Sequence, residues 1–304
     1  MTARRDGHAA YDVVIAGYGG AGAAAAIAAH DAGARVLLLE KSPAGGGSTA
    51  ESGGSFAAVL DRDGAIGERY RVREDGVSHG GTSLWNLLRE NVECRGIEVR
   101  LEVPVTRLLT DRGRVSGVVA HGADGPVEVA ARNGVVLTTG GFGYSADLLR
   151  EWVGAEIPAF GPPGRNDGSG LRMALEAGAA LWHMNAVACG FGYRVPGLDA
   201  AWMCIMRSFG FLMVDATGSR FLDEPAVEHH AAGHALIVRD FATGEFGRLP
   251  SYLIFDEATR RAGRRRRLSQ AAGLDQRAGL VATVQPCPFG TTSTSSARPV
   301  RGSR

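Results

Sequence analysis

The sequence lacks any apolar run long enough to cross a membrane. Its Ala-rich stretch, residues 21–29, is much shorter than the roughly 20 residues that a membrane-spanning helix needs. Residues 1–12 contain two arginines but no apolar segment, so we predict no secretory signal. These absences favour a soluble, cytoplasmic protein with no membrane span.

Cysteine pairs and an excess of one charge are also missing. The four cysteines, Cys94, Cys189, Cys204 and Cys287, form no C-x-x-C pair and have no metal-like spacing, so we interpret them as free thiols. The net charge is +1, which gives no overall field to attract nucleic acid. The basic run at residues 264–267 sits in a polar stretch and is interpreted as a solvated segment that does not bind nucleic acid.

Glycine, in contrast, is abundant, with 44 residues, and it first gathers in a turn after the apolar strand-like stretch 11–17. Gly17, Gly19 and Gly22 form the pattern G-x-G-x-x-G, in which they allow a tight turn, the approach of a diphosphate, and close packing of the next helix. A second strand-like stretch ends at Glu40, where a carboxylate accepts hydrogen bonds from ribose hydroxyls. This βαβ unit predicts an α/β, Rossmann-like dinucleotide-binding fold.

A second glycine-rich turn, "KSPAGGGSTAESGG", follows at residues 41–54. A nicotinamide enzyme has no need of this second turn. FAD is longer, and small residues and hydroxyls there would contact its diphosphate and flavin. The pair of turns therefore favours FAD over NAD.

The sequence resembles the fumarate reductase/succinate dehydrogenase flavoprotein family, which includes 3-ketosteroid 1-dehydrogenases. The resemblance rests on both turns and on later blocks in family order: "PVTRLLTDRGRVSGVVA", "VVLTTGGFGYSADLLREWV", "GLRMALEAGAALWHM" and "VDATGSRFLDE". It covers residues 11–263. It implies a GxGxxG-type FAD-binding domain with a partial α+β cap domain.

The resemblance and the turns together give the expected cofactor-binding residues. They are Gly17, Gly19, Gly20, Ala21, Gly22, Glu40, Lys41, Ser42, Gly46, Gly47, Ser48, Thr49, Ser52, Gly53, Gly54, Val105, Gly140 and Gly141. By resemblance, Val105 contacts the adenine. Respiratory members of the family attach FAD to a histidine in the second turn, and Gly47 occupies that position here. FAD is therefore expected to bind noncovalently.

Catalytic residues are less well marked. The segment between Gly54 and Gly80, which in the family can carry a catalytic tyrosine, is short and offers Tyr70. Fumarate reductases carry an arginine as proton donor near the position of Glu228, so that donor is missing. His229 and His230 remain as weak candidates for a proton or carboxylate role. We predict no metal site, although His230 and His234 are four residues apart.

The expected domains are an FAD-binding domain at 1–182, a partial cap or substrate domain at 183–263, and a disordered or non-native tail at 264–304. The family's second FAD-binding block near the carboxyl end has no counterpart after residue 274, so we expect a truncated chain. The cluster of Trp182, Met184, Trp202, Met203 and Met206 is interpreted as core, or alternatively as the lining of an apolar substrate cavity.

The predicted function is flavin-dependent hydride transfer at a C–C bond next to a carbonyl or carboxylate, as in a ketosteroid dehydrogenase or fumarate reductase. The substrate would be a steroid-like molecule or an unsaturated acid, and the electron-transfer partner stays open. The alternative is a truncated nucleotide-binding fragment without catalysis. A short-chain NAD reductase is disfavoured because no tyrosine is followed four residues later by lysine.

Overall fold

The structure is a computed structural model. It describes residues 4–5, 11–52, 55–59, 66–71, 80–157, 159, 163–186, 192–194, 201–203, 210–227, 232–259 and 281–284. By contacts between its residues, the chain divides into two compact units. The first comprises Met1–Ser145 with Gly161–Ala180, and the second comprises Ala146–Phe160 with Leu181–Arg304.

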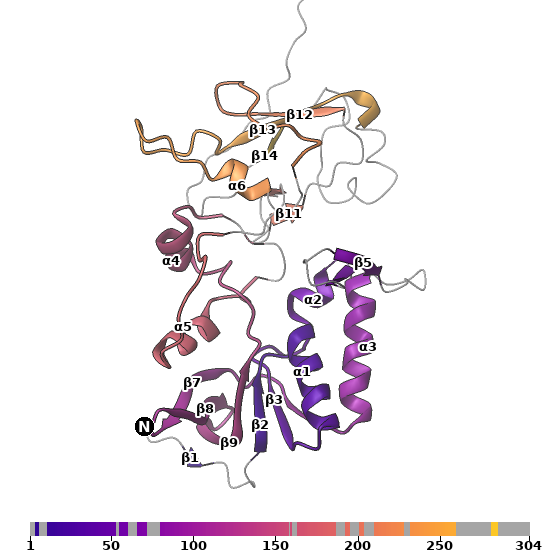
Figure 1. Ribbon diagram of the computed structural model, residues 1–304, viewed down its shortest axis with the longest axis vertical. Coiled ribbons are helices and arrows are strands. Elements are labelled where there is room, and N and C mark those ends of the chain that lie inside the picture. The colour runs from indigo at the N-terminus through magenta and orange to yellow at the C-terminus, as the bar shows by residue number, and fades with distance from the viewer. Residues whose placement is uncertain are drawn as a thin grey trace, which may run out of the picture. The chain divides into compact units, whose positions relative to one another are not determined.

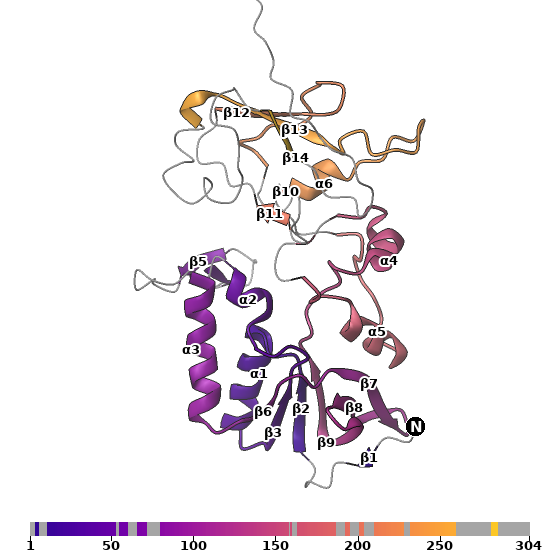
Figure 2. The same ribbon diagram turned by 180° about the vertical axis from the view of Figure 1, so that it is seen from behind.

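The first unit contains a parallel sheet with the strand order β6-β3-β2-β9; Figure 1 labels β3, β2 and β9, and Figure 2 also labels β6. Its strands are β2 (Tyr11–Ala16), β3 (Val36–Leu39), β6 (Glu98–Arg100) and the second half of β9 (Gly125–Leu137). The Ala-rich helix α1 (Gly20–Asp31) connects β2 to β3 and ends before Gly33, whose φ of +88° terminates the helix. The predicted βαβ unit and α/β fold class are therefore confirmed.

Alternate side chains of this sheet belong to two buried clusters. Ile15 and Leu38 pack with α1 and with helix α3 (Gly80–Cys94). Val14 and Leu37 pack instead with a β-meander. Since side chains of a strand alternate between faces, the near-continuous apolar runs of β2 and β3 are what a sheet covered on both faces requires.

The meander consists of β7 (Val105–Asp111), β8 (Arg114–Gly122) and the first half of β9, all antiparallel (Figure 2). Its turns lie at 112–113 and 123–124. The short strand β1 (Arg4–Arg5) pairs with β9. Strand β9 belongs to both sheets, and Gly134, with a φ of +141°, pairs with Val13 in its second half, just after a register shift.

At the amino end of the parallel strands, charged side chains of both signs surround Tyr11. Its hydroxyl donates to Glu98 at 2.7 Å, and the guanidinium groups of Arg35 and Arg100 lie over its ring.

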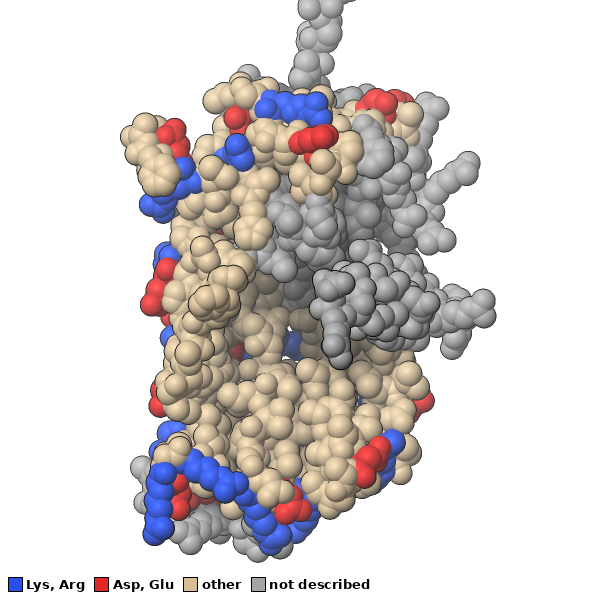
Figure 3. All heavy atoms as spheres, in the orientation of Figure 1, with Lys and Arg blue, Asp and Glu red and all other residues tan. Residues whose placement is uncertain are grey.

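On the face drawn in Figure 3, basic and acidic side chains lie next to one another along the bottom edge. Mixed charge of this kind provides no strong field of one sign.

Helix α3 buries Gly81, Trp85 and Val92, whereas Leu87 is 51% exposed. Positions 81, 85, 88 and 92 recur at helical spacing and form the stripe that faces the core. Within this stripe, Trp85 lies against both glycine-rich turns.

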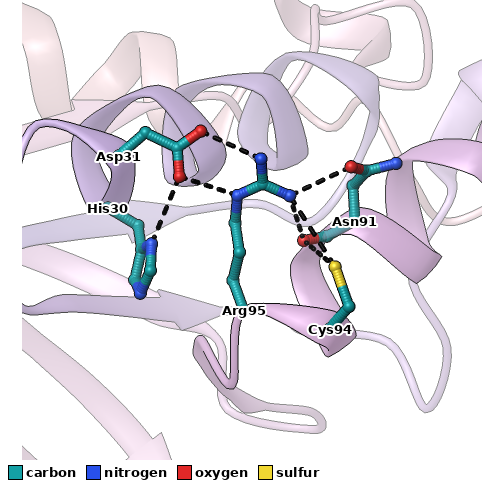
Figure 4. Close-up of polar contacts among 5 residues, drawn as sticks. All are labelled: His30, Asp31, Asn91, Cys94 and Arg95. Atoms are coloured by element: carbon teal, nitrogen blue, oxygen red, sulfur yellow. Dashed lines mark hydrogen bonds and ion pairs between the residues drawn. The ribbon is translucent and has the colours of Figure 1, made fainter.

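The carboxyl ends of α1 and α3 are joined by Arg95 (Figure 4). Its guanidinium donates to both carboxylate oxygens of Asp31, at 2.7 and 2.9 Å, and to the carbonyl and side-chain oxygens of Asn91. Cys94 and His30 flank this group, and the Cys94 thiol is free and exposed. The hydrogen bond from Arg95 lowers the pKa of Asp31. This bidentate pair fixes the two helices to one another at one end.

The remaining elements of the first unit are α2 (Gly47–Glu51), the hairpin of β4 (Ser55–Val59) and β5 (Ile66–Arg71), and helix α5 (Ser169–Glu176). Among the described residues of the chain, no helix has the length and apolarity needed to cross a membrane.

The second unit is smaller in its described part. It contains α4 (Ala146–Leu148), the π-helix η1 (Leu149–Val153), the pair β10 (Gly192–Arg194) and β11 (Ala201–Met203), and helix α6 (Ala232–Leu236). A three-stranded antiparallel sheet is formed by β12 (Phe211–Val214), β13 (Ser251–Phe255) and β14 (Val281–Val284). Strand β14 lies within residues 264–304, which were predicted to be a disordered or non-native tail. The predicted domain boundaries after residues 182 and 263 stay predictions.

The core of the second unit is a cluster of Met213, Leu236 and Leu253. The buried carboxylate of Glu224 accepts hydrogen bonds from the Met213 amide and from Arg220. Burial acts to raise the pKa of Glu224, but these hydrogen bonds outweigh it and the pKa is lowered. Trp182 is 81% exposed and stacks on His183, so the core interpretation is wrong for this residue, and the alternative that it lines a substrate cavity stays a prediction.

Candidate functional site

A cavity of about 670 Å³ lies in the first unit, at the carboxyl ends of β2, β3 and β9. Ligands of open α/β sheets bind at this end of the strands. The lining residues come from both glycine-rich turns, the ends of the parallel strands, the start of β7 and the loop before α5. They are Ala16, Gly17, Gly19, Gly20, Ala21, Leu39, Glu40, Lys41, Gly47, Ser48, Thr49, Pro104, Val105, Thr106, Leu137, Thr138, Thr139, Gly140, Arg165, Asn166, Asp167 and Ser169.

The first glycine-rich turn leaves no room for side chains where the chain packs on itself. A Cβ at Gly17 would lie 2.4 Å from the carbonyl oxygen of Thr138, and one at Gly22 would lie 2.0 Å from that of Gly17. At Gly19 the nearest atom would be 3.8 Å away, so this backbone is open toward the cavity. The positive dipole end of α1 therefore faces the cavity at Gly19, Gly20 and Ala21.

The second glycine-rich turn is hydrogen-bonded to the first. The Gly46 amide donates to the Tyr18 carbonyl at 2.7 Å, and Gly19 and Gly46 form a parallel β-bridge. The hydroxyl of Thr49 accepts a hydrogen bond from the Gly20 amide at 3.0 Å. The two turns thus form one continuous wall, which explains why the sequence needs both.

An aromatic pair supports this wall from behind. The rings of Tyr18 and Trp85 meet edge to face, with their centroids 4.7 Å apart. A Cβ at Gly45 would lie 2.5 Å from the Tyr18 ring and 2.7 Å from the Trp85 ring. Burial raises the pKa of Tyr18 to about 12, and its buried hydroxyl has no hydrogen-bond partner in the part of the chain that the structure describes. The pair is a packing element that fixes the spacing between the turns and α3.

Glu40 is held in place by backbone amides. Its Oε2 accepts from the Tyr18 amide at 2.7 Å and its Oε1 from the Ser42 amide at 2.9 Å. A carboxylate offers about four lone-pair positions, so acceptor capacity remains on both oxygens. This geometry suits two neighbouring ribose hydroxyls.

The loop of residues 163–168 is attached to this wall at two points. The Lys41 ammonium donates to Asp167 at 2.9 Å and to the Gly164 carbonyl at 3.0 Å, and the side-chain amide of Asn166 donates to the Ser48 hydroxyl at 3.0 Å. Burial acts to raise the pKa of Asp167, but hydrogen bonds from Lys41 and Ser169 outweigh it and lower the pKa to about 2. Asp167 is therefore ionised near neutral pH.

Most of the residues predicted from the sequence line this one cavity. They are Gly17, Gly19, Gly20, Ala21, Glu40, Lys41, Gly47, Ser48, Thr49, Val105 and Gly140. Five others contact neighbouring residues. Gly22 packs on Gly17, and the backbone amides of Gly46 and Ser42 donate to the Tyr18 carbonyl and the Glu40 carboxylate. The Ser52 hydroxyl donates to the Thr49 carbonyl, and the Gly141 carbonyl accepts from the Gly168 amide. Gly53 and Gly54 lie outside the described residues.

Sequence reasoning missed a third part of the wall, which comes from residues 165–169 and from Thr106, Thr138 and Thr139. A signal was present in "GRNDGSG", a glycine-rich turn directly before a helix. The catalytic candidates are not brought to the cavity by the described structure. Tyr70 lies in β5, with no description of its side chain, and His229 and His230 lie outside the described residues.

Comparison with known proteins identifies the ligand class. The sequence matches the FAD binding domain family over residues 12–81 and 61–285. The chain belongs to this family. FAD is therefore the cofactor that its dinucleotide cavity is built for, and the prediction of FAD rather than NAD is confirmed.

Two curated relatives agree with this assignment. A 3-oxosteroid 1-dehydrogenase of Mycobacterium tuberculosis is 31% identical over 200 residues, which cover 59% of this chain and 33% of the relative. A fumarate reductase (cytochrome) of Shewanella frigidimarina is 25% identical over 316 residues, which cover 84% of this chain and 53% of the relative. The chain thus spans between a third and about half of the length of these relatives.

Solved structures show the same fold. The 3-ketosteroid Δ1-dehydrogenase of Sterolibacterium denitrificans, solved in complex with 1,4-androstadiene-3,17-dione, superimposes with a TM-score of 0.67. The sequence identity is 19%, and the match covers 83% of this chain and 69% of the other. The family and fold predicted by the sequence resemblance are confirmed.

Proposed function

We propose that this chain binds FAD noncovalently in the cavity of the first unit. We further propose that the bound flavin serves an oxidoreductase acting on a C–C bond next to a carbonyl or carboxylate. One observation carries the proposal. In a chain of the FAD binding domain family, two hydrogen-bonded glycine-rich turns, the amino end of α1 and Glu40 line the same cavity. The oxidoreductase class is supported by the names of the relatives, a 3-oxosteroid 1-dehydrogenase and a fumarate reductase.

The residues of the cavity fit the parts of FAD. Glu40 would accept the ribose hydroxyls, and Val105 would contact the adenine. The open backbone at Gly19, the positive end of α1 and the Thr49 hydroxyl would receive the diphosphate. When bound, the isoalloxazine supplies hydride transfer.

The noncovalent mode rests on the second turn. Gly47 stands where respiratory relatives of the resembled family carry the attaching histidine, and it has no side chain to form a bond. Its φ of +50° also disfavours a larger residue. FAD should therefore leave the protein when it is denatured.

The proton that accompanies hydride transfer needs a protein group. We propose His229, His230 and Tyr70 as the candidates to hold or deliver it. The substrate would be a steroid-like molecule or an unsaturated acid. Within this proposal, residues 1–182 form the FAD-binding domain and residues 183–263 form part of a cap domain.

The test is a titration of the purified protein with FAD, followed by flavin fluorescence. The parent should bind FAD, and acid precipitation should release the flavin into the supernatant. E40A removes charge-assisted hydrogen bonds of about 1.5–3 kcal/mol, so its dissociation constant should rise about tenfold or more. E51A is the matched control, because Glu51 is exposed and does not line the cavity.

Equal affinity of E40A and the parent would remove Glu40 from the site, and flavin that stays with the precipitate would contradict noncovalent binding. Two assays of the FAD-loaded protein test turnover. In the first, a 3-oxosteroid is the electron donor and a dye is the acceptor; in the second, fumarate reoxidises the reduced flavin. Binding without turnover on either substrate class would favour the second candidate, a nucleotide-binding chain without catalysis.

A further inference from the structure

The dinucleotide cavity is lined by four charged side chains: Glu40, Lys41, Arg165 and Asp167. Two of them neutralise one another, since the Lys41 ammonium lies 2.9 Å from a carboxylate oxygen of Asp167. Glu40 has no cationic partner in the described structure and instead accepts two backbone amides. One cation therefore remains.

That cation is Arg165. The residue lines the cavity and is half-buried, yet within the described residues its guanidinium makes no hydrogen bond and no ion pair. Half-buried arginines usually satisfy their five N–H donors with carboxylates, carbonyls or a ligand. An arginine without such a partner, in the wall of a cavity, indicates an anion in that cavity.

The loop around Arg165 is fixed on both sides. The preceding residue, Gly164, accepts a hydrogen bond from Lys41, and the following residue, Asn166, donates to the hydroxyl of Ser48. Ser48 directly precedes Thr49, whose hydroxyl bonds the first amide of α1. Arg165 is thus anchored to the same turn that meets the positive end of α1, where a phosphate group is favoured.

We propose that the guanidinium of Arg165 binds the diphosphate of the cofactor. This inference rests on the proposed FAD binding. A diphosphate brings two negative charges, and the other cation of the cavity, Lys41, is already neutralised by Asp167. The planar fork of arginine matches the geometry of phosphate oxygens, and its hydrogen bonds to them are charge-assisted.

The experiment compares ADP with adenosine, which lacks phosphate, as competitors of FAD. R165Q should raise the dissociation constants of ADP and FAD about tenfold or more and leave that of adenosine unchanged. It should also reduce the dependence of ADP affinity on salt concentration. R165K, which keeps the charge without the planar fork, should fall between R165Q and the parent.

The matched control is R112Q, which removes one positive charge from the exposed β7–β8 turn of the same unit and should bind ADP as the parent does. Circular dichroism establishes that each variant is folded. If R165Q does not fold, R165K decides, because its affinity for ADP should be lower than that of the parent while its affinity for adenosine is unchanged.

Equal ADP affinity of R165Q and the parent would overturn the proposal and leave FAD binding intact. An equal loss of adenosine and ADP affinity would also overturn it, since the guanidinium would then contact the adenine rather than the diphosphate. A parent that binds neither FAD nor ADP would overturn the proposed function together with this inference.

Discussion

The two units differ in how they bury apolar residues. In the first unit, the parallel sheet has a buried cluster on each face, and the rings of Tyr18 and Trp85 pack directly behind the cavity. Among its described residues, the second unit has one small buried cluster, and Trp182 and Phe241 are 81% and 99% exposed. The comparison shows that the geometry of the cofactor cavity is maintained by the core of the first unit itself.

Two tryptophans test this comparison most strongly. Trp85 is 7% exposed and contacts both glycine-rich turns, so W85A should destabilise the protein by about 3–5 kcal/mol. It should also weaken FAD binding, because the turns lose their support. The measurements are urea unfolding followed by circular dichroism and an FAD titration.

W182A provides the control, since the same residue type is removed from an exposed position in the second unit. It should change the free energy of unfolding by no more than about 0.5 kcal/mol and leave FAD affinity unaltered. A similar loss of stability in both variants would remove the distinction between the units.

A pair of glycines sharpens the comparison within the first unit. A Cβ at Gly22 would lie 2.0 Å from a backbone oxygen, so G22A should cost about 1–3 kcal/mol and lower FAD affinity by displacing the first turn. At Gly141 a Cβ would meet nothing within 4 Å, and G141A should be close to neutral. Thermal unfolding and FAD titration of both variants check this, and a neutral G22A would show that the turn adapts.

The smallest effect concerns the ion pair of Lys41 and Asp167. The folded-state pKa of Asp167 is about 2, below its ordinary value of 3.8, so the pair stabilises the fold above pH 4 and this contribution is lost as the pH falls toward 2. The Asp167 side chain is 45% exposed, which limits the contribution to below about 1 kcal/mol.

The difference in unfolding free energy between the parent and D167N should therefore shrink as the pH is lowered from 4 to 2. D124N, at an exposed turn, serves as the control. A difference between parent and D167N that stays constant across this range would contradict the assigned ion pair.

The sequence alone predicts those parts of the site whose residues lie close to one another along the chain. The strand, glycine-rich turn, helix and Glu40 follow one another within thirty or so residues, and their pattern predicts both the fold and the ligand. Residues 165–169 were missed because they reach the cavity through contacts more than 100 residues apart, such as the one between Lys41 and Asp167. Trp85 was not among the predicted site residues, because only packing against Tyr18 decides which side chain of α3 is buried.

Strand β9 has a further consequence for the cooperativity of the first unit. Its thirteen residues pair with β8 in their first half and with β2 in their second half. The meander and the parallel sheet therefore share one continuous backbone segment and cannot open as separate foldons without breaking it. Local opening of the meander, which supplies Val105 and Thr106 to the cavity wall, is tied in this way to the stability of the strands that carry the first glycine-rich turn.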